Sequence, residues 1–290
     1  GKRIRPILTL LGAKLCGHEA DDTVIKHGCV VEYIHAATLL HDDVVDETTV
    51  RRGKETVNAK WGSDASILVG DFLISRAILI LAQDCERKII QAVTEATKIL
   101  VEGGIHEYTE ARNMKVTEKH ILDVIHRKTG SMISVSARLG GLLANATEQQ
   151  ETAIISFGDD FGMAFQLMDD ALDYDSDEAV LGKPPGTDFK EGHVTLPLHH
   201  LYNNADRSLK KELEAFVKNE NITEKNLHYI VEHMHKHKSI DYTVNLARFY
   251  IDRAKSHLRK SDFPAPQYIE HFDAVADYIH SRHTATTATP

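Results

Sequence analysis

Two stretches of this chain carry the same arrangement of acidic side chains, three aspartates in the pattern Asp-Asp-x-x-Asp. The first set is Asp42, Asp43 and Asp46, and the second is Asp169, Asp170 and Asp173. Residues three and four apart lie on one face of an α-helix, so each set gathers its carboxylates on one patch. Apolar residues precede both sets, at 36–40 and 161–165. We therefore expect both patches to be shielded from open solvent.

Carboxylates crowded in an apolar setting repel one another unless a cation lies among them. An all-oxygen cluster suits Mg²⁺, which keeps part of its water shell and readily shares the rest with phosphate oxygens. A single Asp-Asp-x-x-Asp is as easily a solvated helix face, because runs of charge are usually exposed. Two copies favour the other interpretation, a phosphate bound through Mg²⁺.

Basic residues accompany the acidic sets along the chain. They are Lys2, Arg3 and Arg5 at the start, Arg51 and Arg52 after the first set, Lys128 in the middle and Lys183 after the second set. Six aspartates alone would repel a diphosphate. With Mg²⁺ between them, and with arginine guanidinium and lysine ammonium groups on the outer oxygens, the same site would bind diphosphates. The whole set predicts a site for two diphosphates.

The composition narrows the class of protein. The chain has 290 residues and a net charge of −9, so broad nucleic-acid binding through a basic face is not expected. Its three cysteines show neither metal-ligand spacing nor an even count, which is typical of a reducing compartment. The apolar run after Arg5 resembles a short signal peptide, but Gly12 and Lys14 interrupt it. We also find no apolar stretch of membrane-spanning length and predict a soluble, cytoplasmic protein.

The dominant period of the apolar residues is helical, and no convincing strand pattern is present. We expect helices over residues 6–16, 22–47, 65–83 with Asp64 as a cap, 87–111, from Thr117 onwards, 148–173 and through 195–282. Small residues from 130 to 146 predict tight helix packing. The clear loop is 182–193, an expected lid, and 284–290 is an expected frayed tail. The predicted fold class is all-α, a single large helical bundle over 1–290.

The motifs, taken together, resemble those of the trans-isoprenyl diphosphate synthases, and most closely their long-chain polyprenyl members. The matching segments are Gly-Lys-Arg-Ile-Arg-Pro at 1–6, Leu-His-Asp-Asp-Val-Val-Asp at 40–46 with Arg-Arg-Gly at 51–53, Lys-Thr-Gly at 128–130, 165–173, Gly-Lys at 182–183 and Thr-Leu-Pro at 195–197. They run nearly end to end and keep the order of the family. This makes the resemblance far more specific than one isolated acidic motif.

The resemblance implies an isoprenoid synthase fold in which the aspartate motifs face each other across a central cavity. Asp42, Asp46 and Asp169 would bind Mg²⁺, with Asp43, Asp170 and Asp173 in support. Arg51, Lys128 and Lys183 would hold an allylic diphosphate, with Thr129 and Gln166 near the reacting carbons. Lys2, Arg5, His35 and Arg52 would hold isopentenyl diphosphate. A homodimer is also implied, and because relatives begin earlier, an N-terminal helix is expected to be missing.

The implied reaction is the condensation of isopentenyl diphosphate with an allylic diphosphate to give an all-trans polyprenyl diphosphate. Cations stabilise the departing pyrophosphate while the allylic carbon, now cation-like, is attacked by the double bond of isopentenyl diphosphate. Two positions depart from the common pattern: His193 stands where many relatives have lysine, and Glu107 where many have glutamine.

The residues one helical turn before Asp42 bear on product length. Ala37 and Thr38 occupy positions where short-chain relatives place bulky aromatics. A turn rises about 5.4 Å, close to one extended isoprene unit, so small residues there leave room for a long product. We predict a long-chain product of the kind used as a quinone side chain. The alternative is that the small residues only let helices pack closely, in which case the chain could still be a short-chain farnesyl or geranylgeranyl diphosphate synthase.

Three other functions fit part of the sequence. A di-iron carboxylate bundle would use the Glu-x-x-His pairs at 32–35 and 232–235, but it leaves both aspartate sets unexplained. Terpene cyclases share one aspartate motif, yet carry Asn and Ser at their second metal site. A non-catalytic partner subunit of a synthase tends to lose one of the two sets, and both are intact here.

Overall fold

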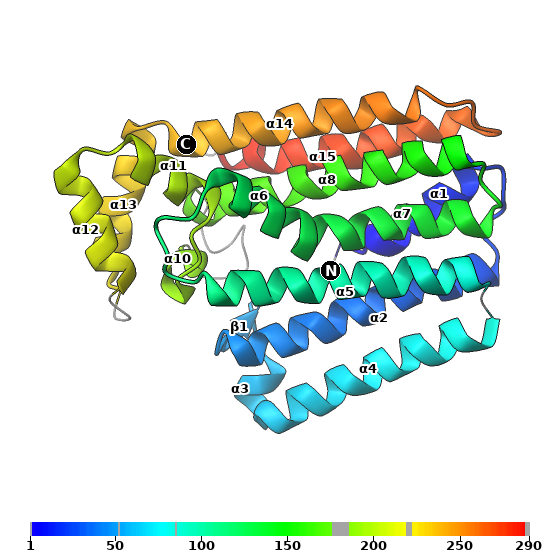
Figure 1. Ribbon diagram of the computed structural model, residues 1–290, viewed down its shortest axis with the longest axis horizontal. Helices are drawn as coiled ribbons and strands as arrows, with labels where there is room; N and C mark the ends of the chain where they lie inside the picture. Colours follow the sequence, from blue (N-terminus) through cyan, green and yellow to red (C-terminus); the bar gives the residue numbers. More distant parts are fainter. Residues whose placement is uncertain (1, 52, 85, 176–185, 219–221, 288–290) are drawn as a thin grey trace.

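The computed structural model describes residues 2–51, 53–84, 86–175, 186–218 and 222–287. Long helices run side by side along the long axis, with α8 between α7 and α14, as Figure 1 shows. The all-α fold class is confirmed. The first half of the chain comprises α1 (Ile4–Leu15), α2 (Asp22–Val45), α3 (Val57–Trp61), α4 (Ser63–Asp84), α5 (Arg87–Thr109), α6 (Glu118–Ile125) and the π-helical turn η1 (His126–Gly130).

The second half continues the bundle and adds a group of shorter helices at one end (Figure 1). It comprises α7 (Ser131–Leu143), α8 (Glu148–Asp175), α10 (Thr187–Glu191), α11 (Leu196–Asn204), α12 (Arg207–Lys218), α13 (Glu224–Lys236), α14 (Ser239–Leu258), the 3₁₀ turn η2 (Pro266–Tyr268) and α15 (Ile269–Thr287). The basic turn after the first motif is a small antiparallel hairpin of β1 (Val50–Arg51) and β2 (Lys54–Glu55).

Side-chain caps explain where several helices begin. Asp21 accepts a hydrogen bond from the Val24 amide at 2.9 Å and starts α2, and Thr117 accepts one from the His120 amide and starts α6 as predicted. Two expectations were wrong. Asp64 lies inside the first turn of α4 and is not its cap, and α15 continues through 284–287, where a frayed tail was expected.

Helix α2 ends at Val45, two residues before the predicted end, and this places Asp46 differently from Asp42. Asp46 is the C-cap, with φ −91° and ψ 2°, and its amide still donates to the Asp42 carbonyl at 2.8 Å. The three aspartates of the first motif therefore span the last turn and the end of the helix. The following hairpin leads the chain back over that end.

Helix α8 forms the centre of the main hydrophobic core. Its fully buried side chains include Phe157, Phe161, Leu167, Met168 and Leu172. They belong to one cluster with apolar side chains of α14, α15 and the shorter helices α10 to α13. A second core cluster joins α2, α4, α5 and α7. Each aspartate motif thus lies at the end of a helix that helps to form a core, and this rigid support fixes the position of the carboxylates.

Glycines permit the closest helix contacts, as the run of small residues at 130–146 predicted. A Cβ on Gly140 of α7 would lie 2.0 Å from the Thr9 carbonyl oxygen of α1. A Cβ on Gly158 of α8 would lie 2.5 Å from the Ser134 Cα. The Thr9 hydroxyl donates to the Ser136 carbonyl at 2.9 Å across the same α1–α7 contact. These helices pack backbone to backbone.

Helix α4 contradicts the expectation that no stretch could cross a membrane. Its segment Ser63–Gln83 has 21 residues and a mean hydropathy of 2.0, which meet the length and composition of a membrane span. Only 28% of the apolar window is buried inside the chain. Phe72, Leu68 and Ile78 are among its exposed side chains.

Substitution of Gly140 by alanine should destabilise the fold by about 2 kcal/mol or more, because the new methyl group meets backbone atoms that cannot move independently. Gly28→Ala is the matched control. Its Cβ would meet Pro6 at an ordinary 3.5 Å, so higher helix propensity should leave stability unchanged or raised by up to about 1 kcal/mol. Urea unfolding followed by circular dichroism measures both, and equal effects would refute the packing argument.

Candidate active site

The first aspartate motif lies where α2 ends. Asp43 is buried, and Asp42 and Asp46 are partly buried. Burial raises the pKa of Asp42 and of Asp46, because it disfavours the charged form. The Lys128 ammonium acts in the opposite direction on both pKa values. These two carboxyl groups therefore sit where a nearby positive charge stabilises their ionised form.

Arg51 holds the remaining carboxylate of this motif. Its Nε donates to Asp43 Oδ1 at 2.6 Å, and the Asp43 carbonyl accepts from the Asn58 side chain at 3.2 Å and from the Thr48 amide at 3.0 Å. The hairpin is thus attached to the end of α2 through Asp43. Arg52, also predicted to bind substrate, lies outside the described residues.

The second motif lies near the C-terminal end of α8. Gln166 donates to Asp170 Oδ1 at 2.8 Å, and the fully buried Asp173 accepts the Asp188 amide at 3.2 Å through Oδ2. Asp169 is partly buried. Burial, reinforced by the neighbouring Asp188, raises the pKa of Asp170 well above its ordinary value. Burial and the nearby carboxylates therefore disfavour the ionised form of Asp170.

The turn η1 connects the two motifs. Lys128 forms an ion pair with Glu107 of α5, and Thr129 donates to Gln166 Oε1 at 2.8 Å. Burial lowers the pKa of Lys128, but Glu107 and Asp42 outweigh it and hold that pKa above its ordinary value, so the ammonium stays charged. Single π-helical turns are frequent at functional sites, because they re-aim side chains within a continuous helix.

The short helix α10 connects the motifs from the other side. Its Asp188 amide bonds to Asp173, and its Glu191 accepts from the Thr48 hydroxyl at 3.4 Å, just after the first motif. His193 follows α10 and opposes part of the rise that burial causes in the pKa of Asp46. The second part of the segment 182–193, which was expected to be a lid, therefore forms α10 and the residues next to it. Lys183 and the rest of the segment 176–185 lie outside the described residues.

The comparisons with known proteins agree with this geometry. The polyprenyl synthetase family profile matches residues 1–234. The octaprenyl diphosphate synthase of Haemophilus influenzae is 40% identical over 252 residues, which cover 86% of this chain and 75% of that protein. Component 2 of the heptaprenyl diphosphate synthase of Bacillus subtilis is 33% identical, with 97% and 79% covered. A crystal structure of a polyprenyl synthase from Caulobacter crescentus, complexed with calcium and isoprenyl diphosphate, matches with a TM-score of 0.92 at 34% identity and covers 97% of this chain and 85% of that one.

The chain belongs to the polyprenyl synthetase family. It is a prenyltransferase, a polyprenyl diphosphate synthase, with the isoprenoid synthase fold. The family resemblance, the fold and the enzyme class predicted from the motifs are confirmed. The roles of individual residues remain predictions, and the structure places several of them in relation to this synthase site.

Three of the residues predicted to bind isopentenyl diphosphate lie on or next to α1 and α2, and the fourth, Arg52, is outside the described residues. Lys2 is exposed, with its ammonium 5.4 Å from the centre of the Tyr278 ring of α15. Arg5 lies in the first turn of α1, and His35 lies on α2 about two turns before Asp42. Arg3, which we did not assign to substrate, forms an ion pair with Glu32 on the same face of α2 as His35.

The two positions predicted to set chain length differ in exposure. Ala37 is fully buried on α2, and Thr38 is partly buried, with its hydroxyl donating to the His35 carbonyl at 2.9 Å. Position 37 therefore faces the interior of the protein and not the solvent. Whether the alkyl chain passes this point remains a prediction that product analysis can test.

Sequence reasoning missed the partner of Lys128 and the part played by α10. Glu107 was noted only as a departure from the family pattern, and its ion pair depends on how α5 packs on η1. A Cβ on Gly103 would lie 2.7 Å from Arg127 Cβ, so this glycine permits the approach. Spacing alone does not show it, since Glu107 and Lys128 lie on separate elements.

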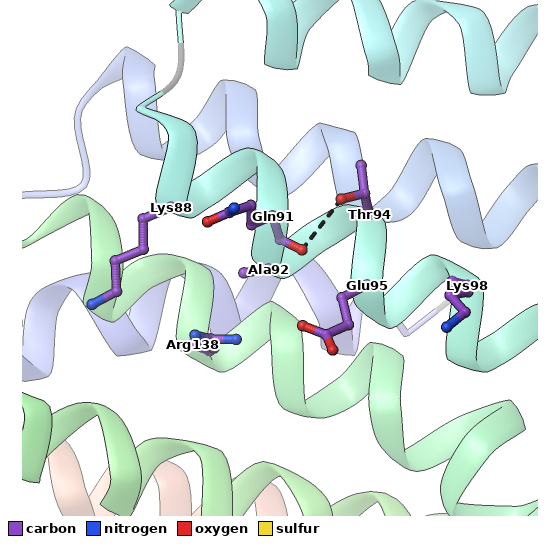
Figure 2. A pocket seen from close by; sticks show the side chains of 7 residues that line it. All are labelled: Lys88, Gln91, Ala92, Thr94, Glu95, Lys98 and Arg138. Atoms are coloured by element: carbon purple, nitrogen blue, oxygen red, sulfur yellow. Dashed lines mark hydrogen bonds between the residues drawn. The ribbon is translucent and has the colours of Figure 1, made fainter.

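A surface hollow elsewhere is not part of this site. Figure 2 shows it between α5 and α7, with Lys88 and Arg138 on adjacent helices. Both cations pair with the buried Glu151 of α8, at 2.6 and 2.7 Å, and they lower its pKa against the opposing effect of burial. These contacts hold three helices together, which accounts for the charged residues there.

The di-iron alternative does not fit the fold. Glu32 of α2 pairs with Arg3, and His235 of α13 lies 3.4 Å from Asp175. Figure 1 shows α13 at the end of the molecule, away from the middle of α2 where the other Glu-x-x-His pair lies.

Proposed function

We propose that the chain is a Mg²⁺-dependent synthase that condenses isopentenyl diphosphate with an allylic diphosphate into an all-trans, long-chain polyprenyl diphosphate. The observation that carries the proposal is the linkage of the two carboxylate clusters, through Thr129 and Gln166 on one side and through α10 on the other. Relatives named octaprenyl and heptaprenyl diphosphate synthases support a long product. A quinone side chain is the proposed use, and the cytoplasm the proposed location.

The donor set fits Mg²⁺. Carboxylate oxygens are its preferred protein ligands, and burial raises the pKa of Asp42 and Asp46, so a cation there relieves an unfavourable charge. Asp42, Asp46 and Asp169 would hold the metal. Bound Mg²⁺ neutralises the diphosphate and stabilises the pyrophosphate as it leaves. A relative crystallised with calcium and isoprenyl diphosphate is consistent with this assignment.

The protein residues have distinct proposed tasks. Lys128 is positioned beside the first motif and holds the allylic diphosphate, together with Arg51 and Lys183. Thr129 and Gln166, hydrogen-bonded to each other, lie near the reacting carbons and keep Asp170 in place. Isopentenyl diphosphate is held by Lys2, Arg5, His35 and Arg52.

The chemistry needs no nucleophilic side chain. The C–O bond of the allylic diphosphate breaks, and its electron pair leaves with pyrophosphate. The double bond of isopentenyl diphosphate then forms a new C–C bond to the allylic carbon, and the released pyrophosphate takes a proton from the resulting cation, which restores the alkene. Fixed charges in a site shielded from water stabilise the separating charges without reorganisation. The intact second motif argues against the alternative of a non-catalytic partner subunit.

Asp42→Ala and Asp169→Ala should each lower turnover by about 10²–10³-fold, because each removes a metal ligand at the point where charge develops. Incorporation of radiolabelled isopentenyl diphosphate measures the rate. Asp159→Ala, on α8 about three turns before Asp169, is the control, since its carboxylate faces His126. Circular dichroism should show all three variants folded. Wild-type turnover in a folded Asp42 or Asp169 variant would refute the assignment.

The product should be a ladder that ends near eight isoprene units. Enlarging position 37 through Val, Leu and Phe should shorten it in steps, because each larger side chain closes the space one turn before Asp42. Mass spectrometry of the dephosphorylated products measures their length. A product spectrum that is unchanged in a folded, active Ala37→Leu variant would show that the limit lies elsewhere, and a wild-type product of three or four units would favour the short-chain alternative.

The apolar side of α4 is the proposed homodimer interface. Leu68 and Phe72 are 67% and 61% exposed, and exposed apolar residues of α5, Val101 and Ile105, add to the surface. An exposed apolar area of this kind on a folded chain is typical of a surface that binds another protein or a membrane. A second copy, implied by the family resemblance, would cover it.

Light scattering should give twice the chain mass for the wild type and the single-chain mass for Leu68→Glu/Phe72→Glu, because buried charges oppose association. Phe249→Glu on α14 is the control, since it places the same charge on another exposed apolar residue. A wild type of single-chain mass that floats with lipid vesicles would instead assign α4 to a membrane.

A further inference from the structure

A second set of potential metal ligands lies beside the aspartate motifs. Asp188 and Glu191 of α10 and the following His193 each offer one ligand atom, and these three atoms lie within 4.8 Å of one another. We propose that they form a separate divalent-cation site that selects a transition metal such as Mn²⁺, Co²⁺ or Zn²⁺ over Mg²⁺.

The backbone holds these three residues in a tight loop. Gly186 and Gly192 flank α10 in left-handed conformations, with φ 68° and 90°, and the His193 amide donates to the Asp188 carbonyl at 2.8 Å. The Arg112 amide fixes the outside of the loop through the Gly192 carbonyl at 2.8 Å. The site is therefore arranged before any ligand arrives.

The donor atoms determine the class of metal. Two carboxylates and one imidazole suit Mn²⁺, Co²⁺ and Zn²⁺, whereas Mg²⁺ prefers oxygen ligands and water. His193 Nδ1 lies 3.8 Å from Glu191 Oε2, so the ring already faces the carboxylate with which it would share a cation. Position 193 is thus what separates this set from the all-oxygen clusters of the aspartate motifs.

Acidic side chains of both motifs lie close to this set. Asp188 raises the pKa of the buried Asp170, second to the effect of burial itself, and its amide bonds to Asp173. On the other side, His193 is close enough to Asp46 to oppose part of the rise that burial causes in the pKa of that carboxyl group. A divalent ion between them would attract carboxylates from both motifs and reduce their repulsion. The site adjoins the proposed diphosphate site but does not depend on prenyl transfer.

Pulsed electron paramagnetic resonance of Mn²⁺ tests the proposal on the substrate-free protein in excess Mg²⁺. Mn²⁺ retained by the wild type should show coupling to an imidazole nitrogen. His193→Gln should lose that coupling and weaken the retained Mn²⁺ binding by at least about tenfold, since even outer partners of a ligand contribute 10–100-fold. His193→Asp should keep an ion but show no nitrogen coupling.

His41→Gln is the matched control, because His41 is adjacent to Asp42 in sequence but its ring faces α4, with Nε2 3.3 Å from the Ile67 carbonyl. It should retain the nitrogen coupling. Coupling that persists in His193→Gln, or complete displacement of Mn²⁺ by Mg²⁺ in the wild type, would overturn the proposal. Because no turnover is measured, this result is independent of the outcome for the proposed reaction.

Discussion

Repulsion among closely placed carboxylates is the constraint on which the rest of this structure depends. Two helices bring three aspartates each into surroundings that exclude much of the solvent, where like charges interact strongly. Groups of the protein itself bind three of these six aspartates. Arg51 holds Asp43, Gln166 holds Asp170, and a backbone amide of α10 binds Asp173. These are the three aspartates to which the family resemblance assigns a supporting role.

The bundle keeps these charges in place because its helices cannot easily shift. Helix α8 is buried along most of its length, and α1, α7 and α8 touch through glycines at distances that leave no room for a side chain. A core at this packing density transmits strain and does not deform smoothly. The carboxylates are thus positioned against their own repulsion by apolar burial elsewhere in the molecule, which is the larger favourable term in folding.

The features that could be predicted from the sequence are those that depend on residues close together along the chain. Helical periodicity, the Thr117 cap and the two acidic motifs are local patterns, and each appeared where expected. The contacts of Glu107 with Lys128 and of Asp188 with Asp173 were not predicted, because they depend on how separate elements pack. The end of α2 was placed two residues too late, since the hairpin that follows it is held by Arg51 and Asn58 through tertiary contacts.

The same charges bear on how a metal ion and a diphosphate would affect each other's binding. Lys128 pairs with Glu107 and also faces Asp42 and Asp46, whose pKa values are raised chiefly by burial, against the opposing effects of Lys128 and Arg51. A diphosphate arriving alone would add further negative charge to this region and would compete with Glu107 for the same lysine. A divalent cation that comes first, or with the diphosphate, changes the sign of the interaction. In the proposed assignment, metal and substrate binding are therefore thermodynamically coupled, and each would raise the affinity for the other by the same factor.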